Sequence, residues 1–209
     1  MNIEKTIEAL KSNRFEAYFV GSRDQAKELA LSLIPSGAVV SSGGSVTLNE
    51  AGIISAVKSG NYEYIDRYAP NLSDEERQRL TERSMTSDVF LTSSNAITEN
   101  GELYNVDGNC NRVAAMLYGP KSVIVVTGKN KIVPDVSSAV ERVKSVSAPL
   151  NAKRLSCQTY CNAAGKCISN SMGAGCNSTQ RICSGYTLMS HQRYPGRVKV
   201  IIVDEELGY

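Results

Sequence analysis

The longest apolar segments of this 209-residue chain are short, and they constrain the fold class more than any other feature. Ser122–Thr127 is almost continuously apolar, which is typical of a strand buried on both faces of a parallel sheet. Val198–Val203 has the same character and is predicted to be the last strand. Neither approaches the roughly 20 apolar residues that a membrane-spanning helix needs, so no transmembrane segment is predicted.

Helical and extended patterns alternate along the rest of the chain. Further strands are predicted at Phe15–Val20, Ala38–Ser41, Tyr62–Asp66, Val89–Thr92 and Glu102–Val106. Helices are predicted over the first dozen residues, at Arg23–Ile34, Asn49–Lys58, Asn111–Tyr118 and Asp135–Val146, and after Ser73, where a capping-box pattern occurs. This alternation predicts a single α/β domain, residues 1–209, with a Rossmann-like, mostly parallel sheet flanked by helices.

One segment, about residues 156–196, interrupts this alternation. It is rich in Cys, Gly, Ser and Asn and has little apolar periodicity. So long a stretch is uncommon in a compact domain unless it is functional or held by something other than apolar packing. We expect a cysteine-rich loop attached near the C-terminal end of the domain.

Five of the six cysteines lie in this loop, spaced Cys-x3-Cys-x5-Cys-x8-Cys-x6-Cys from Cys157 to Cys183. Thiolates are ligands for zinc and iron–sulfur clusters, and four can complete either kind of site. The Cys-x2-Cys pairs usual in zinc sites are absent, which favours a [4Fe-4S] cluster over zinc. Free or disulfide-paired cysteines are the alternative. His191, the only histidine, is a solvated side chain or a replacement for one thiolate.

The net charge of the chain and its first five residues indicate which partners it binds and where in the cell it is located. Lys plus Arg number 23 and Asp plus Glu 21, a formal net charge of +2 without a long run of one sign. A charge-driven nucleic-acid or membrane-surface binder is therefore not indicated. Met1–Lys5 carries mixed charges and no apolar core typical of a secretory signal. We expect a cytoplasmic protein, in which clustered thiols more often bind metal than form disulfides.

The first candidate ligand site is the turn Ser42-Gly43-Gly44, between a predicted strand and a predicted helix. Glycines allow a ligand to approach the backbone, and free amides attract phosphate or carboxylate. Neither a Walker sequence nor the Gly-x-Gly-x-x-Gly fingerprint is present. An anion site and a simple connection are both compatible with this turn.

Three more polar stretches follow predicted strands. Asn95 and Glu99 lie after Val89–Thr92, where open α/β sheets bind ligands, and Glu99 is the candidate acid, base or nucleophile. The dipeptide Asn100-Gly101 alternatively predicts a plain hairpin turn. Arg112, at a helix start, and Lys129, after Ser122–Thr127, are candidate partners for an anionic group.

Several motifs in order resemble the LUD domain of lactate-utilization proteins. They are Asn95–Gly101, Val106–Asn109, Asn111–Ala114, Gly128–Val133 and Arg181–Cys183, and the match runs from about Ser41 to Gly208. The resemblance implies a fold similar to the NagB, ribose-phosphate isomerase and CoA-transferase group. It also implies a role in oxidising L-lactate to pyruvate among other lactate-utilization subunits that use iron–sulfur clusters.

The resemblance also assigns the cysteines. Single-domain relatives carry a tail resembling Cys-x5-Cys-x2-Cys-x6-Cys, onto which Cys161, Cys167, Cys176 and Cys183 fall in order. The second gap is x8 in this chain, so Cys157 is a possible substitute for Cys176. Cys110 stands where a small residue is expected. Thr98–Gly101 resembles the Ser-Glu-Asn-Gly around the nucleophilic glutamate of some CoA-transferases.

These observations lead to one main hypothesis and two others. The first is a LUD-domain protein that binds a small anionic substrate through Ser42, Gly43, Gly44, Asn95, Arg112 and Lys129 and an iron–sulfur cluster or zinc through its cysteine loop. The second is a CoA-transferase-like or sugar-phosphate isomerase-like enzyme that uses Glu99. The third is a noncatalytic subunit whose metal only orders the loop.

Overall fold

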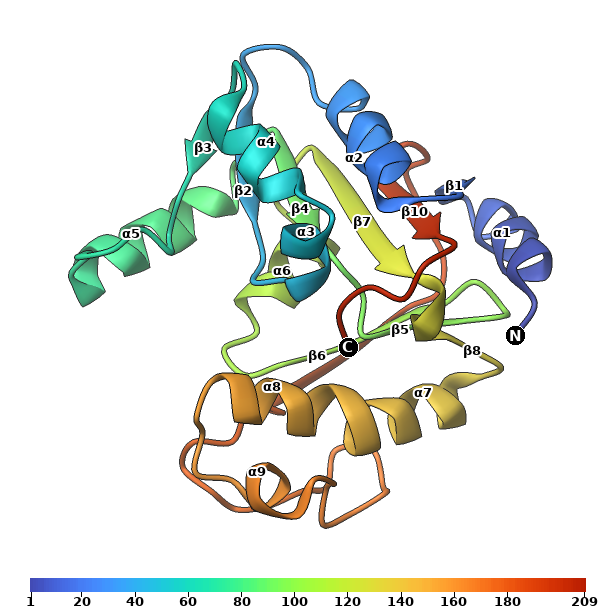
Figure 1. Cartoon of the computed structure of the whole chain (residues 1–209), viewed down its shortest axis with the longest axis vertical. Coiled ribbons are helices and arrows are strands. Elements are labelled where there is room, and N and C mark those ends of the chain that lie inside the picture. Colours follow the sequence, from blue (N-terminus) through green and yellow to red (C-terminus); the bar gives the residue numbers. More distant parts are fainter.

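The chain forms two β-sheets enclosed by helices (Figure 1). The computed structural model describes residues 1–209. In chain order the elements are α1 (Ile3–Ser12), β1 (Glu16–Val20), α2 (Arg23–Ser32), β2 (Val39–Ser42), α3 (Val46–Glu50), α4 (Ile53–Ser59), β3 (Glu63–Ile65), α5 (Asp74–Ser84), β4 (Val89–Thr92), β5 (Ala96–Thr98), β6 (Leu103–Asp107), α6 (Asn111–Leu117), β7 (Ser122–Gly128), a 3₁₀ turn η1 (Lys129–Lys131), β8 (Ile132–Val133), α7 (Val136–Arg142), a π-helical turn η2 (Val143–Ser147), α8 (Ala148–Arg154), α9 (Tyr160–Ala164), β9 (Gly185–Met189) and β10 (Val198–Val203). None of the helices is both long and apolar enough to cross a bilayer.

The larger sheet has six parallel strands in the order β1-β10-β7-β4-β2-β3. Its two longest strands, β7 and β10, lie side by side, with Val198 opposite Val123 and Val203 opposite Gly128. Every residue from Val200 to Val203 is buried. The mostly parallel α/β sheet flanked by helices is therefore confirmed, with the apolar segments at its centre because both faces are covered.

Helices α2, α3 and α4 cover one face of this sheet. Their apolar side chains form one core with the strands, which includes Ala26, Ala30, Leu48, Ile53 and Val57 from the helices and Val40, Leu91, Ile124, Val126 and Ile201 from the sheet. Burying a Val, Leu or Ile side chain of this core contributes about 1.5–3 kcal/mol. The predicted helix Asn49–Lys58 is in fact two, α3 and α4, because Gly52 between them adopts a left-handed backbone with φ of +67°.

The other face of the large sheet is covered by α1, α6 and a second sheet. This four-stranded sheet has the order β8-β5-β6-β9 and was not predicted from the sequence as a separate layer. Ile97 and Leu103 point toward the large sheet, and the alternate residues Ala96 and Tyr104 pack against α7. The hairpin turn predicted at Asn100-Gly101 joins β5 to β6.

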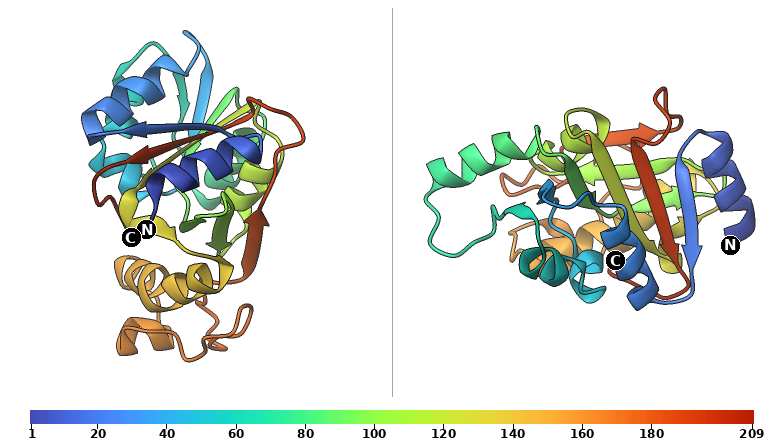
Figure 2. Two further views of the ribbon diagram at one scale, coloured as in Figure 1. Left: turned by 90° about the vertical axis from the view of Figure 1, so that its right-hand side faces the viewer. Right: turned by 90° about the horizontal axis from the view of Figure 1, so that it is seen from above.

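The cysteine-rich segment is more regular than we expected. It contains α9 and also β9, which pairs antiparallel with β6 along its whole length. The strand escaped prediction because it is an edge strand whose residues are mostly half-buried, so it lacks a clear apolar alternation. In Figure 1 and in the left view of Figure 2, α7, α8 and α9 lie beyond the second sheet, away from the large one.

Helices α7 and α8 run on from one another through the π-helical turn η2. Pro149 lies just after this turn and has no N–H to donate to the carbonyl of Ser145, so the regular α-helical bond is impossible there. The predicted helix Asp135–Val146 thus continues to Arg154. A π-helical turn inside a helix is uncommon and often borders a functional site.

Gly101 ties the hairpin to α1. A Cβ at this position would stand 2.6 Å from the carbonyl carbon of Ala9 and from the nitrogen of Leu10, and its φ is +77°. Gly37 has nearly the same φ, +72°, but open space around it. Both Gly→Ala changes place alanine in a left-handed backbone, at about 1 kcal/mol or more.

We therefore expect Gly101→Ala to lower the free energy of unfolding by about 1–3 kcal/mol more than Gly37→Ala, because only the former also forces a clash with backbone. Urea denaturation followed by circular dichroism measures the difference. Equal losses in the two variants would show that the hairpin does not pack against α1 as described.

Candidate functional site

A cavity of about 850 Å³ opens where three neighbouring strands of the large sheet end. Residues 44–47 follow β2, Ser93–Asn95 follow β4, and Lys131 follows β7, and these strands are adjacent in the order β7-β4-β2. Parallel strands present their carboxyl ends at one edge, where open α/β sheets bind ligands. Helix α8 and the segment Thr179–Cys183 close the other side. We call this cavity the basic pocket.

The basic pocket brings together some of the predicted ligand residues. Gly44, Asn95 and Arg112 line it. Ser42 and Gly43 lie behind its wall: the Ser42 hydroxyl is 2.7 Å from the Tyr64 hydroxyl, and a Cβ on Gly43 would stand 2.9 Å from Cγ and Cδ of Arg112. Gly43 therefore serves the pocket by leaving space for the Arg112 side chain.

Lys129 and Glu99 lie outside the basic pocket. The Lys129 ammonium is exposed and pairs with Asp204 at 2.9 Å. Glu99 lies in the β5–β6 hairpin against the start of α1, where its carboxylate accepts hydrogen bonds from the Asn2 amide at 2.8 Å and from Lys5 at 3.2 Å. These bonds hold the pKa of Glu99 below its usual value, with the Asn2 amide the larger cause. The catalytic role of Glu99 stays a prediction. Because Glu99 lies outside the basic pocket, that role cannot concern a ligand bound there.

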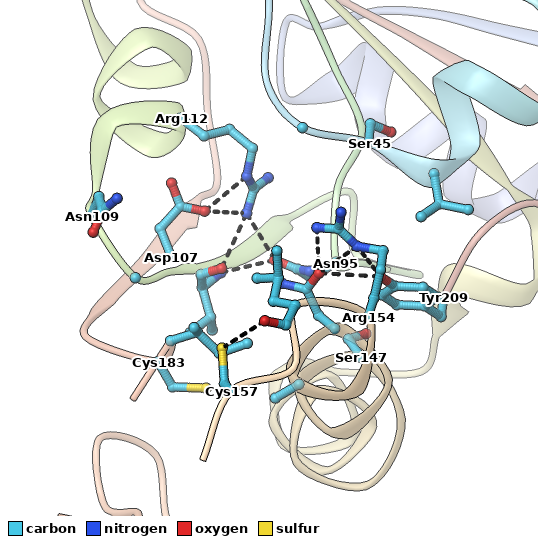
Figure 3. A pocket seen from close by; sticks show the side chains of 18 of the residues that line it. Ser45, Asn95, Asp107, Asn109, Arg112, Ser147, Arg154, Cys157, Cys183 and Tyr209 are labelled. Atoms are coloured by element: carbon cyan, nitrogen blue, oxygen red, sulfur yellow. Dashed lines mark hydrogen bonds and ion pairs between the residues drawn. The ribbon is translucent and has the colours of Figure 1, made fainter. Parts of the chain in front are cut away.

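Arg112 has a structural part in the pocket wall. Its Nε and Nη2 both lie 2.8 Å from Oδ1 of Asp107, and Nη1 donates to Asn105 Oδ1 at 2.7 Å and to the Ser93 carbonyl at 3.1 Å. Nη2 also donates to Asn95 Oδ1 at 2.9 Å. Figure 3 shows Arg112 and Asp107 on one wall, facing Arg154 and Tyr209 on the other. The guanidinium donors that we expected to meet a ligand already have protein acceptors.

Four further cations line the basic pocket and were not singled out from the sequence: Arg67, Lys131, Arg154 and Arg181. Asp107 is the only acidic side chain in the lining, and Arg112 already pairs with it. Arg67 is 9% exposed, and its Nε has no hydrogen-bond partner. A buried donor without an acceptor costs stability, about 1–3 kcal/mol, unless something else supplies the acceptor. The field in the pocket is thus positive, and Arg67 keeps one buried donor unpaired.

Lys131 is the most deeply buried of these cations, at 3% exposure. Its Nζ donates to Thr47 Oγ1 at 2.8 Å and to Ser93 Oγ at 3.1 Å. Burial, reinforced by the nearby positive charges of Arg142 and Arg112, lowers the pKa of Lys131 to about 7. Lys129, Lys131 and Val133 have the same alternation phase in the sequence, so periodicity does not distinguish the two lysines; the 3₁₀ turn Lys129–Lys131 does.

The four predicted metal ligands share a second, smaller cavity, which we call the thiol cavity. Cys161, Cys167, Cys176 and Cys183 all line it, together with the buried side chain of Lys144. Cys157 lies instead in the wall of the basic pocket, and His191 is in neither lining. All six cysteines are free thiols. The structure thus brings together the set of four that the resemblance assigned, without Cys157.

The thiol cavity has the donor chemistry of a metal site but not its tight geometry. Burial, and secondarily the neighbouring Cys161 and Cys167, raises the pKa of Cys183 to about 11. No three His, Cys, Asp or Glu side chains are grouped closely enough to hold a metal ion. The four thiols fit the softness that zinc and iron–sulfur clusters require, and a metal would demand that they move closer together.

The two cavities share a wall. Arg181, Ile182 and Cys183 line both of them, as do Val143 and Ala148 from the helical segment beneath. In Figure 3, Cys183 and Cys157 lie at the floor of the basic pocket. A group held by Cys183 would therefore border the basic pocket.

The fold and these adjoining cavities define an α/β domain with a basic ligand pocket beside a cavity lined by cysteines. The LUD domain matches residues 3–203, so the chain belongs to the LUD domain family, the one its motifs resemble. No curated protein sequence matches it. A DUF162 family protein from Deinococcus radiodurans is 16% identical, with 96% of this chain and 95% of that one covered at a TM-score of 0.52, and it shares the fold. Ribose 5-phosphate isomerase A from Methanocaldococcus jannaschii is 18% identical over 55% of each chain at a TM-score of 0.35, too distant a likeness to bear on the fold.

The Arg112–Asp107 pair gives a direct test of the pocket wall. The two side chains are 12% and 11% exposed, so Arg112→Met should lower the free energy of unfolding by about 3–5 kcal/mol by leaving a buried carboxylate unpaired. Lys129→Met breaks an exposed pair and should cost less than about 1 kcal/mol. Urea denaturation compares the two, and a similar small loss in both would contradict the structural role of Arg112.

Proposed function

We propose that this LUD-domain protein binds a small carboxylate, L-lactate or pyruvate, in the basic pocket and takes part in the oxidation of one to the other. The observation that carries the proposal is the unbalanced positive charge of the pocket, in which Arg67, Lys131 and Arg154 have no carboxylate partner because the one acidic side chain of the lining, Asp107, pairs with Arg112. An anion entering this space gains hydrogen bonds to cations, and such charge-assisted bonds are stronger than bonds between neutral groups.

Arg67 is one of the cations that we expect to contact the ligand. Its Nε is buried and unpartnered, while its Nη2 is held by the Tyr68 hydroxyl at 2.7 Å, so the guanidinium is oriented before any ligand arrives. Its carbon Cζ also lies 4.9 Å from the centre of the Tyr68 ring. Because the orientation is fixed in advance, little conformational entropy is lost on binding.

We also propose that Cys161, Cys167, Cys176 and Cys183 hold a [4Fe-4S] cluster, with zinc as the alternative metal. Oxidation of a hydroxy acid releases two electrons that side chains alone do not accept. When bound, a cluster supplies one-electron transfer. The shared wall through Cys183 supports this pairing, because it sets the thiol cavity directly against the basic pocket. Lys144 and Arg181 would offset the negative charge of the thiolates.

Other lactate-utilization subunits are the partners this proposal implies, since the electrons must leave the domain. The alternative of a CoA-transferase-like or isomerase-like enzyme using Glu99 gains no support from the pocket, because Glu99 is held by Asn2 and Lys5 at the hairpin. A noncatalytic subunit whose metal only orders the loop would bind metal without binding lactate or pyruvate.

Removal of the Arg67 charge tests the anion site. We expect Arg67→Met to weaken L-lactate and pyruvate binding by about 10-fold to 100-fold, which corresponds to losing one hydrogen bond to a charged group. Isothermal titration calorimetry measures the affinities. Arg67→Lys should fall in between, and Lys129→Met, outside the pocket, should bind as the parent protein does. Unchanged affinity in Arg67→Met, or no binding by the parent protein, would refute the proposal.

Metal content tests the cysteine assignment. Protein purified without oxygen should contain iron and acid-labile sulfide in equal amounts, and Cys→Ser changes at 161, 167, 176 and 183 should each remove or greatly reduce them. Cys110→Ser and Cys157→Ser should retain the metal, because these two thiols lie outside the thiol cavity. Stoichiometric zinc in colourless protein would favour the alternative metal. Protein without either metal, or equal retention in all six variants, would contradict the assignment.

A further inference from the structure

Lys131 has surroundings that a purely electrostatic role does not explain. Lysine cations inside proteins normally have a carboxylate partner, yet no carboxylate pairs with Lys131, and its Nζ contacts only the hydroxyl oxygens of Thr47 and Ser93. The Thr47 hydroxyl in turn donates to the Leu207 carbonyl at 3.1 Å, so its lone pair faces Lys131. This environment suits an amine better than an ammonium ion.

The hydrogen-bond count supports the neutral form. An ammonium group has three N–H donors, and only two acceptors are present. A neutral amine has two N–H donors and one lone pair, so the two hydroxyl oxygens satisfy both donors and leave the lone pair free. Since Lys131 lines the basic pocket, that lone pair is available to a molecule bound there.

The cations around Lys131 also favour its neutral form. Arg142 from α7 and Arg112 from α6 both lower the pKa of Lys131, as burial does. Glu50 from α3 raises it, but by less than any of these. The pKa of about 7 means that a large fraction of Lys131 is neutral at neutral pH, whereas an ordinary lysine with a pKa near 10.4 is almost wholly protonated. Desolvation beside other cations is a known way to activate a lysine nucleophile.

We propose that Lys131 is a nucleophile, and that its amine condenses with the carbonyl carbon of a 2-oxo acid bound in the basic pocket. The inference rests on the proposed function in one respect, namely that the pocket accepts a small carboxylate. It adds that the preferred ligand carries a carbonyl group next to that carboxylate, as pyruvate does and lactate does not.

The reaction needs no oxidant or reductant. The Nζ lone pair forms a C–N bond while the carbonyl π bond breaks, which gives a carbinolamine. The carbinolamine oxygen then leaves as water with the two protons that the amine loses, and a C=N bond remains. Thr47 and Ser93, whose hydroxyls are 2.8 and 3.1 Å from Nζ, are within reach to move these protons.

Reductive trapping tests this inference in the intact protein. Incubation with pyruvate and sodium cyanoborohydride, followed by peptide mass spectrometry, should find one carboxyethyl group per chain, on Lys131. Trapping should already be half-maximal near pH 7, because the pKa of Lys131 is about 7. L-Lactate has no carbonyl and should slow the reaction by competing for the pocket without forming an adduct.

The adduct in the parent protein is located directly by fragmentation, so the result does not depend on the folding of a variant. Lys131→Arg should abolish the adduct, and Lys129→Arg, which alters an exposed lysine two residues away, should leave it intact. Ser93→Ala should slow trapping by about 10-fold if its hydroxyl moves protons.

Three results would overturn the inference. Calorimetric binding of pyruvate without any adduct would refute the nucleophile and leave the proposed function standing. Labelling spread over exposed lysines, and unchanged in Lys131→Arg, would do the same. Absence of both binding and adduct would refute the two proposals together.

Discussion

The hydrogen bonds of Arg112 are the interaction on which the basic pocket depends. One guanidinium reaches from α6 to Asp107 and Asn105 on β6 and to the loop after β4, and so joins the second sheet to the carboxyl edge of the first. Gly43 makes room for it, since any Cβ there would meet its side chain at 2.9 Å. A planar group with five donors can hold three backbone segments in fixed relation, which an ammonium group could not do.

Because Arg112 is engaged in these bonds, the electrostatic field of the basic pocket depends on the other charged side chains that line it. Asp107 is neutralised by Arg112, so Arg67, Lys131 and Arg154 face the cavity without an opposing carboxylate. The two most buried of them respond differently. Arg67 is held in its orientation by the Tyr68 hydroxyl, whereas burial pushes Lys131 toward its neutral form. In one pocket, a guanidinium and a free amine suit a ligand that has both a carboxylate and an electrophilic carbon.

The central sheet could be predicted from sequence because its strands are apolar on both faces and its helices begin at recognisable caps. The second sheet could not, because β8 has two residues and β5 has three, too few for any periodicity to appear, while β9 is held mainly by backbone bonds to β6. Gly44, Asn95 and Arg112 were found because they follow strands. Lys129 was chosen instead of Lys131 because the 3₁₀ turn between β7 and β8, which turns the first outward and the second inward, leaves no mark in composition. Cys161, Cys167, Cys176 and Cys183 line one cavity because their loop is anchored at both ends, by α8 and by β9.

The π-helical turn Val143–Ser147 has a consequence for how the two cavities are coupled. A regular helix advances about 100° per residue, so one face repeats in register along its length. The wider turn shifts that phase by one residue, so Lys144 points to the thiol cavity, Ser147 to the basic pocket, and Val143 and Ala148 to both. A single helix thus acts as a common floor for two chambers, and a small rewinding of it would alter both at the same time.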